Sequence, residues 1–273
     1  MGQSMRHLAR PVWLLLILFL LCGCGGRSST LPPNQSTPGS QNQPKPDWVA
    51  GNWQLSSKSA AGMSALSIAG GISQSGSSLS GAVHVSGSNC FDPLTTMSLT
   101  GAVTGNNISL TSTSFGGQII TFNGSFANNS FTGTYTIDGG CAGGDHGNVD
   151  GLEIFAIGYS WSGTLTASSG VTFDVTARLT QGSSPSPQGS FPITGTATLT
   201  PCFNSAMLMS DAFPSGSFLI GTSVALEIQT NNGVVSFLGT LDPTEDQISG
   251  NYTINGGTCD QAGTGILSIN WDY

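Results

Sequence analysis

The sequence has very little positive charge beyond its first fifty residues. From residue 48 to residue 273 the only basic side chains are Lys58 and Arg178, against thirteen Asp and Glu residues, so this region has a formal net charge of −11. Nucleic-acid-binding proteins neutralise phosphates with Lys and Arg, and anionic lipid head groups attract clusters of the same residues. The composition therefore excludes nucleic-acid binding and disfavours binding to an anionic lipid surface.

Recognisable catalytic motifs are also missing. The sequence contains no G-x-S-x-G, no H-E-x-x-H and no Gly-rich phosphate loop. Beyond the N-terminal region the histidines are His84 and His146, and we interpret His84 as a surface or lumen residue of an alternating strand. We expect a non-enzymatic protein without a cofactor, and a hydrolase that lacks a recognisable motif is the less favoured alternative.

Candidate metal ligands cluster only in the segment DGGCAGGDHGNVDGLE, residues 138–153. Asp145 and Asp150 offer carboxylate oxygens, which Ca²⁺ takes as ligands. The acidic residues do not fall at the first and last positions of an EF-hand loop, and the second copy of the repeat described below lacks the cluster. The pattern favours a solvated acidic loop, so no metal site is predicted.

Long apolar runs are absent except for one near the N-terminus, at residues 12–22. This run is too short to cross a hydrocarbon core, which requires about 20 helical residues. It follows Arg6 and Arg10, and a positive segment before a short apolar one is typical of a cleaved secretory signal.

The end of this run, Leu21-Cys22-Gly23-Cys24, resembles the lipobox of bacterial lipoproteins. In that family the chain is cut before the last Cys, which carries the lipid. The resemblance implies a signal peptide over residues 1–23 and a lipid anchor on Cys24. Because Gly25 rather than Asp follows, it also implies the outer membrane. A plain signal peptide cut elsewhere and a C-x-C metal site are the alternatives.

Residues 24–47 are rich in Pro, Ser, Asn and Gln and contain Leu31 as their only sizeable apolar side chain. Such a segment cannot bury enough surface to offset the entropy of ordering. We interpret it as a flexible tether between the lipidated Cys24 and the rest of the chain, and a recognition peptide is the alternative.

The remaining sequence contains two copies of one design. GTYTIDGGC at residues 133–141 recurs as GNYTINGGTC at 250–259, and ITFNGSF at 120–126 matches VSFLGTL at 235–241. The offset between matching positions grows along the chain, which indicates loop insertions in the second copy. We predict two homologous domains, at residues 48–157 and 158–273.

Within each copy apolar and polar residues alternate with period two, and turn signals separate the alternating segments. We predict an all-β fold in which each domain is an antiparallel, up-and-down β-barrel of about eight strands, because closure removes exposed strand edges. A single 16-strand membrane barrel is the competing architecture.

The motif Gly51-Asn52-Trp53 resembles the G-x-W of lipocalins and avidins, which are calycin barrels. The resemblance implies a barrel whose first strand carries this tryptophan. The second copy has Tyr159-Ser160-Trp161 at the same place, so its glycine is missing. The resemblance does not imply a biotin site in this chain, because its tryptophans lie at the domain ends. We interpret Trp53 and Trp161 as plugs that close one end of each core.

The four cysteines beyond the signal fall two in each copy, at equivalent positions. Four cysteines allow three pairings, and the repeat selects Cys90 with Cys141 and Cys202 with Cys259. Disulfides form in exported proteins, so we predict one in each domain. The spacing lacks the short C-x-x-C of metal sites.

Together these patterns predict a protein anchored to the membrane by its N-terminal lipid, which binds a small apolar molecule, a glycan or an envelope protein. The alternative is a structural envelope protein with filled barrel cores. An eight-stranded barrel either fills with side chains or holds one small ligand. The first copy is richer in small residues, namely Gly81, Ala82, Gly101 and Ala102. We therefore expect any cavity in residues 48–157, with Trp53 at its closed end.

Overall fold

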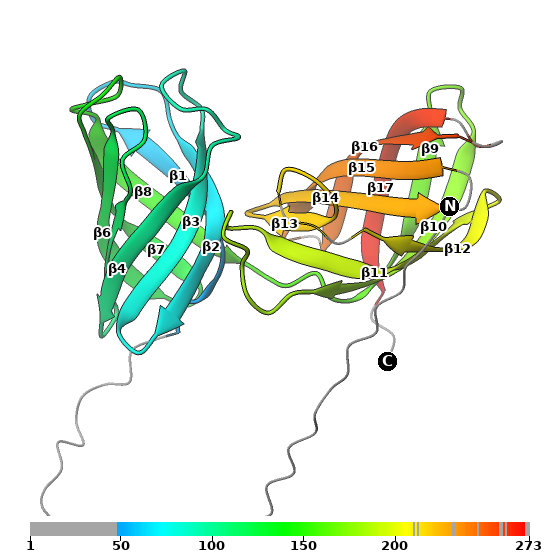
Figure 1. Ribbon diagram of the computed structural model, residues 1–273, viewed down its shortest axis with the longest axis horizontal. Helices are drawn as coiled ribbons and strands as arrows, with labels where there is room; N and C mark the ends of the chain where they lie inside the picture. The colour runs from blue at the N-terminus through cyan, green and yellow to red at the C-terminus, as the bar shows by residue number, and fades with distance from the viewer. Residues whose placement is uncertain are drawn as a thin grey trace, which may run out of the picture. The chain divides into compact units, whose positions relative to one another are not determined.

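The computed structural model describes residues 48–209, 211, 213–230, 233–244, 246–256, 259 and 261–270. The predicted signal segment, Cys24 and the predicted tether lie outside these residues, as does Trp271. The described residues belong to one compact unit and are built from β-strands (Figure 1). Within them, no helix has the length and apolar character of a transmembrane span.

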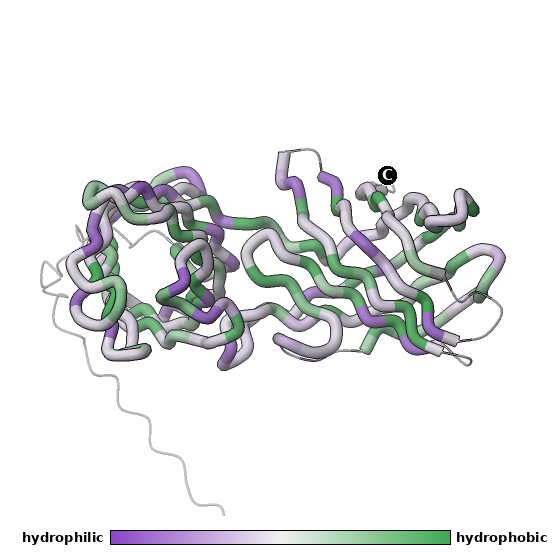
Figure 2. The backbone as a smooth tube through the Cα atoms, turned by 90° about the horizontal axis from the view of Figure 1, so that it is seen from above, coloured by the Kyte–Doolittle hydropathy of each residue, from purple (hydrophilic) through white to green (hydrophobic). Residues whose placement is uncertain are grey.

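The first domain is a closed barrel of eight antiparallel strands, each paired with the next along the chain and the last with the first. Figure 2 looks along this barrel, whose chain closes into a ring. Its strands are β1 (Gly51–Ser59), β2 (Ser67–Ser75), β3 (Ser78–Ser86), β4 (Met97–Thr104), β5 (Asn107–Ser112), β6 (Ile119–Ala127), β7 (Ser130–Asp138) and β8 (His146–Ile154).

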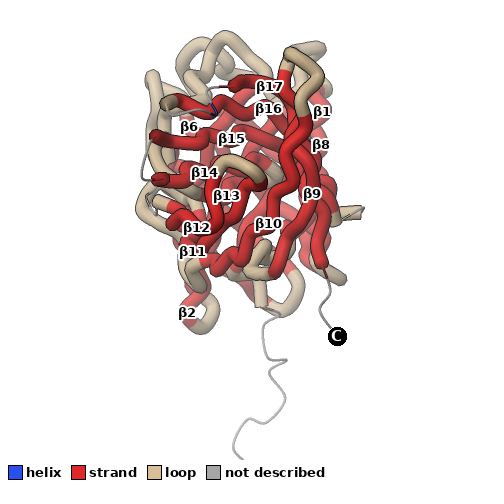
Figure 3. Tube along the Cα trace, turned by 90° about the vertical axis from the view of Figure 1, so that its right-hand side faces the viewer, coloured by secondary structure: helices blue, strands red, loops and turns tan. Residues whose placement is uncertain are grey.

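The second domain repeats this barrel and adds one short strand. The pairing of β10 with β11 closes the sheet, and β17 pairs with β9; Figure 3 shows these strands. They are β9 (Ser160–Ala167), β10 (Thr172–Gln181), β11 (Phe191–Thr200), β12 (Phe203–Leu208), β13 (Phe218–Ile220), β14 (Ser223–Thr230), β15 (Gly233–Asp242), β16 (Gln247–Asn255) and β17 (Gln261–Asn270). The predicted fold of two antiparallel barrels is confirmed, and the single large barrel is excluded.

The extra strand arises because one strand position of the second barrel is interrupted. Both β12 and β13 pair with β11 on one side and with β14 on the other. Together they occupy the place that β4 holds between β3 and β5 in the first barrel. The chain departs from this strand position at Met209 and rejoins it at Ser217. The N–H of Ser217 donates to the carbonyl of Met209 at 2.8 Å.

A buried tryptophan closes one end of the first barrel, as predicted. Trp53 is 2% exposed, and its indole N–H donates to the carbonyl of Val49 at 3.0 Å. The N–H of Val49 in turn donates to Oε1 of Gln74 at 2.7 Å. The segment before β1 is thereby held across the barrel end, with its buried polar groups paired.

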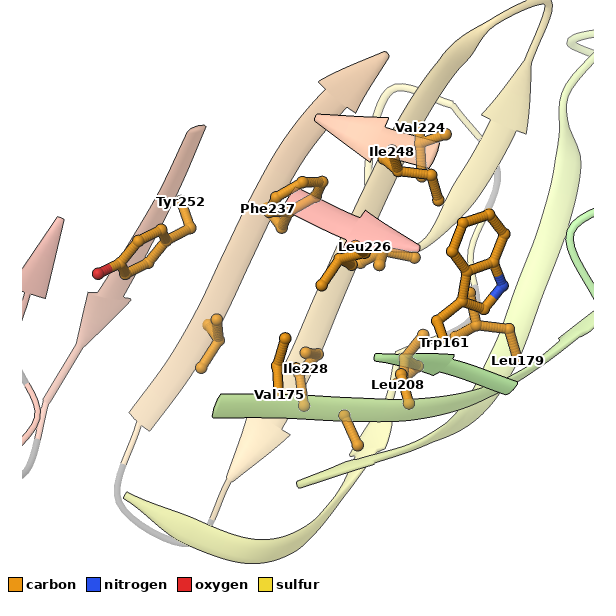
Figure 4. Close-up of a cluster of buried hydrophobic side chains, with 14 of the residues drawn as sticks. Trp161, Val175, Leu179, Leu208, Val224, Leu226, Ile228, Phe237, Ile248 and Tyr252 are labelled. Atoms are coloured by element: carbon orange, nitrogen blue, oxygen red, sulfur yellow. The ribbon is translucent and has the colours of Figure 1, made fainter. Parts of the chain in front are cut away.

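The second barrel repeats this arrangement with an equivalent tryptophan and glutamine. Trp161 donates to the carbonyl of Ile157 at 3.0 Å, and the N–H of Ile157 donates to Oε1 of Gln181 at 3.0 Å. Around the tryptophan, side chains from β9, β10, β12, β14, β15 and β16 fill the interior (Figure 4). The repeat found in the sequence is therefore a repeat of packing as well as of strands.

Both predicted disulfides are present. Cys90 is bonded to Cys141, with Cα atoms 5.4 Å apart, and Cys202 is bonded to Cys259, with Cα atoms 5.8 Å apart. Each bond joins the segment after the third long strand of its barrel to the segment before the last strand. No disulfide therefore joins one barrel to the other among the described cysteines.

The expectation that small residues leave room inside the first barrel is wrong for the alanines. In β3 and β4 the core side chains are Leu79, Val83, Leu99 and Val103, so Ala82 and Ala102 point outward in the alternation. Gly81 and Gly101 do point inward. However, a Cβ at either glycine would collide with the backbone of the neighbouring strand. These glycines bring the strands close together, and they do not hollow the core.

Candidate functional site

Two segments that the first copy lacks carry one of the two contacts between the barrels. The first copy joins β2 to β3 by residues 76–77, whereas the second joins β10 to β11 by residues 182–190. A Cβ on Gly71 would collide with Pro185 of this longer loop. The second segment is the interruption between β12 and β13, which carries Phe213 to the first barrel.

Both segments meet at His84, which is 7% exposed. Its Nε2 lies 2.8 Å from the carbonyl oxygen of Gln188, and its Nδ1 lies 3.1 Å from the carbonyl oxygen of Pro93. The Phe213 ring lies against the imidazole with centroids 4.4 Å apart. His84 is therefore neither a surface nor a lumen residue. It points outward from β3 into the contact between the barrels.

The outer face of β1 forms the second contact. The side-chain amide of Asn52 donates to the carbonyl of Gly221 at 2.8 Å and accepts from its N–H at 2.7 Å. Beside it, Oε1 of Gln54 accepts from the N–H of Thr222 at 3.3 Å, and its Nε2 donates to Oγ of Ser67 at 2.9 Å. Two neighbouring amides thus bind the turn between β13 and β14.

Next to these contacts lies an open groove of about 600 Å³, lined from both barrels. Its base is a buried apolar cluster, formed by Phe218, Ile220 and Ala225 with the half-buried Ala69 and Phe213. Two exposed leucines border it, namely Leu94 of the first barrel and Leu238 of the second, each 65% exposed. The other side chains along it are mainly Ser, Thr, Asn and Gln.

The cavity next to Trp53 is far smaller. It has a volume of about 20 Å³ and an entirely apolar lining that includes Leu55, Ile72, Phe122 and Phe131. Ligand pockets measure about 300–1,000 Å³, and a cavity needs about 10–15 Å³ to hold one water molecule. Trp53 therefore borders no cavity of ligand size in the described interior, and the expectation of one there is corrected.

The two candidate metal ligands point in different directions. Asp145 is 3% exposed and accepts hydrogen bonds from the hydroxyls of Ser59 at 2.5 Å and Tyr135 at 2.9 Å. Asp150 is exposed on the outer face of β8. Among the residues that the structure describes, no three His, Cys, Asp or Glu side chains are grouped to hold a metal ion. The structure thus gives Asp145 a structural contact and leaves Asp150 in solvent.

The tyrosine that matches Tyr135 in the second copy has no such contact. Tyr252 is 2% exposed, and its hydroxyl finds no hydrogen-bond partner among the described residues. Leu165 and Ala167 occupy the places that Ser57 and Ser59 hold in the first barrel. Burial raises the pKa of Tyr135, and the nearby Asp145 carboxylate adds to this rise. Burial also raises the pKa of Tyr252.

A carboxyl group lies beside the glycine of the G-x-W motif. Glu153 lies opposite Trp53 on β8, and a Cβ on Gly51 would lie 2.5 Å from its Oε1. Partial burial raises the pKa of Glu153. In the second barrel the backbone position opposite Trp161 is Ile269, and Tyr159 replaces the glycine.

The groove residues were missed by sequence reasoning because they look ordinary. His84, Leu238 and Asn251 all occupy outward positions of alternating strands, where exposure to solvent is the default expectation. Only the growing offset between the two copies pointed to the site. That offset marks the insertions that carry Gln188 and Phe213.

Comparisons with known proteins add no functional assignment. No family model and no curated protein matches the chain. Among solved structures, kievitone hydratase from Nectria haematococca is similar over 84% of this chain and 91% of that chain, with 12% sequence identity and a TM-score of 0.23. A TM-score this low supports neither a shared fold nor a shared activity, so the function is argued from the residues of this chain.

Proposed function

We propose that this chain is a non-enzymatic binding protein of the bacterial cell envelope, held at a membrane by lipid on Cys24, and that it binds its ligand in the groove between the barrels. The observation that carries the proposal is the difference in volume between the groove and the cavity beside Trp53. The groove measures about 600 Å³ and the cavity beside Trp53 about 20 Å³, so of these two the groove is the one in the size range of ligand pockets.

The position and lining of the groove support the same function. Ligand sites occur preferentially at domain interfaces, where apolar surface is combined with a few placed polar groups. Here the half-buried Phe213, which packs on the buried Phe218, supplies aromatic surface, and Asn251 and the hydroxyl residues supply polar groups. The contacts at His84 and Asn52 hold the two walls together, so the site is formed before a ligand arrives.

The location of the protein is inferred from the lipobox and from the disulfides. A disulfide in each barrel fits an oxidising compartment outside the cytoplasm. The resemblance of residues 21–24 to a lipobox supports a lipid anchor, and Gly25 supports the outer membrane.

The surroundings of the two described histidines support a non-enzymatic function over a hydrolase. Both ring nitrogens of His84 face backbone carbonyl oxygens, and His146 is exposed, with its Nδ1 3.0 Å from the carbonyl of Gly144. A general base needs a free nitrogen within hydrogen-bond reach of a nucleophile. A structural envelope protein remains the second candidate, because the interiors of both barrels are filled.

The proposal is tested by mapping binding onto the fold by NMR. The full chain, with ¹⁵N label, is titrated with lipid, neutral glycan and protein fractions of a bacterial envelope. We expect the amide signals of Leu94, Phe213 and Leu238 to shift in a saturable way. Shifts centred on Trp53 and Phe122 would place the ligand inside the barrel. The absence of saturable shifts with every fraction would favour the structural alternative.

A further inference from the structure

We propose that the groove binds a neutral oligosaccharide, an inference that rests on the proposed binding function and names the ligand class. Three features of the groove carry it, namely the absence of charged side chains, rows of hydroxyl groups on its walls, and an apolar base with aromatic rings.

The described lining of the groove contains no Asp, Glu, Lys or Arg. Its one titratable side chain is that of His84, whose ring nitrogens both face backbone carbonyls of the protein. A phosphate, carboxylate or ammonium group would lose its hydration on entering such a groove without gaining an ion pair. The ligand is therefore uncharged where it contacts the groove.

Hydroxyl groups form a row across the wall contributed by the second barrel. Ser223 on β14 lies opposite Thr240 on β15, which lies opposite Ser249 on β16. The strands are about 4.8 Å apart, so the three hydroxyls follow one another at this spacing. In the next row of the same wall, Asn251 lies opposite Leu238.

These polar groups are free to bind a ligand. The side chains of Ser223, Thr240, Ser249 and Asn251 are exposed, and they have no hydrogen-bond partner within the described part of the chain. Each hydroxyl can donate and accept, and the amide can do both at once. The opposite wall adds a pair of hydroxyls, because Ser67 lies opposite Ser86. A ligand with many hydroxyls of its own matches both walls.

The apolar base distinguishes a sugar from a merely hydrophilic ligand. Phe213 and Phe218 lie edge to face, with centroids 5.4 Å apart. Phe218 is 6% exposed and supports the half-buried Phe213 from below, so Phe213 and the exposed Leu238 give the groove its apolar strip beside the hydroxyl rows. A sugar ring has an apolar C–H face and polar edges, so one ring can use both surfaces. A purely apolar molecule would leave the hydroxyl rows unpaired and gains most from an enclosed pocket.

The duplication provides a natural control inside the same chain. The first barrel has a depression of about 590 Å³ on its outer surface, lined by Ser109, Asn123, Ser125 and Thr132. In the repeat Thr132 and Thr134 match Ser249 and Asn251 of the groove. This depression has hydroxyls but neither the paired phenylalanines nor a second wall, so we expect it not to bind the sugar.

The test is isothermal titration calorimetry on the full chain, solubilised in a detergent without a sugar head group, such as lauryldimethylamine oxide. The probes are maltotetraose, cellotetraose and chitotetraose, with tetragalacturonate as the charged counterpart. We expect saturable one-to-one binding of at least one neutral probe and none of the charged probe. Asn251→Ala and Ser249→Ala should each weaken binding about three- to tenfold, the effect of losing one hydrogen bond.

The matched controls are Thr134→Ala and Thr132→Ala, which should leave the affinity unchanged. The inference is overturned if no neutral probe binds at millimolar concentration, or if the control variants weaken binding as much as the groove variants do. A titration with an apolar dye, N-phenyl-1-naphthylamine, distinguishes a wrong ligand class from a wrong binding function. If the dye shifts the groove amides and no sugar binds, the ligand class is wrong and the groove is still a binding site. If neither the dye nor any sugar binds in the groove, the proposed binding function is wrong as well.

Discussion

Asn52 and Gly221 lie 169 residues apart and exchange two hydrogen bonds, of 2.8 and 2.7 Å, between a side-chain amide and a backbone N–H and C=O. The amide thereby pairs with the backbone as a neighbouring strand would. Gly221 has a φ of +53°, and a Cβ there would collide with Gln54 and Ala69. The middle residue of the G-x-W motif thus binds the second barrel, while the tryptophan closes the first.

Replacing Asn52 by Ala should lower the free energy of unfolding by about 1–3 kcal/mol, because it leaves the buried N–H and C=O of Gly221 without partners. Chemical denaturation measures this loss, and hydrogen exchange at Gly221 should speed up. Ser160→Ala changes the equivalent position of the second barrel and serves as the control. Equal stability of the Asn52 and Ser160 variants would show that the amide pair contributes nothing.

The two equivalent tyrosines should respond differently to the loss of their hydroxyl. Tyr135→Phe removes a hydrogen bond to the buried Asp145 and should cost about 1–3 kcal/mol. Tyr252→Phe removes a buried hydroxyl without a described partner and should be neutral or stabilising. Thermal unfolding of both variants measures this difference. A lower melting temperature for the Tyr252 variant than for the Tyr135 variant would contradict the prediction.

Glu153→Gln should stabilise the protein at neutral pH. Partial burial raises the pKa of Glu153, so the folded state holds this proton more tightly than the unfolded state does. Stability therefore falls as the pH rises through the carboxyl range, and at pH 7 the charged Glu153 opposes folding. The melting temperature of the variant should exceed that of the native chain at pH 7, and the difference should vanish at acidic pH. A gain that persists unchanged in acid would exclude ionisation as its cause.

In the purified protein each disulfide should lie within one barrel. Non-reducing peptide mapping should find Cys90 linked to Cys141 and Cys202 linked to Cys259. Removing the first pair by a double Ser substitution should cost up to about 4 kcal/mol in the chain-entropy account of loop closure. Recovery of a peptide that links Cys90 to Cys202 would contradict this arrangement.

The proposed lipid anchor depends on Cys24. Cys24→Ser should abolish incorporation of a labelled fatty acid and release the protein from the membrane fraction, because the serine hydroxyl does not form the thioether. Cys22→Ser is the matched control and should stay lipidated. Membrane association of the Cys24 variant equal to that of the native chain would refute the anchor.

The alternating pattern, the internal repeat and the turn signals were enough to predict the two barrels. They also predicted the cysteine pairs and the burial of Trp53 and Trp161. These features are local or repeated. A strand that faces a core on one side must alternate with period two, and equivalent positions of two homologous copies must have equivalent neighbours. For the same reason the fold class and the framework of disulfides could be predicted without the structure.

The position of the proposed binding groove followed only from packing in three dimensions. An outward position in an alternating strand looks the same whether it faces water or a second domain, so His84, Phe213 and Asn251 carried no sequence signal of their own. The volume left inside a barrel depends on how side chains and neighbouring strands fill it, as Gly81 and Gly101 show, and composition does not fix that volume. Packing between segments more than a hundred residues apart therefore placed the candidate site in the groove and closed the cavity that the small residues had suggested.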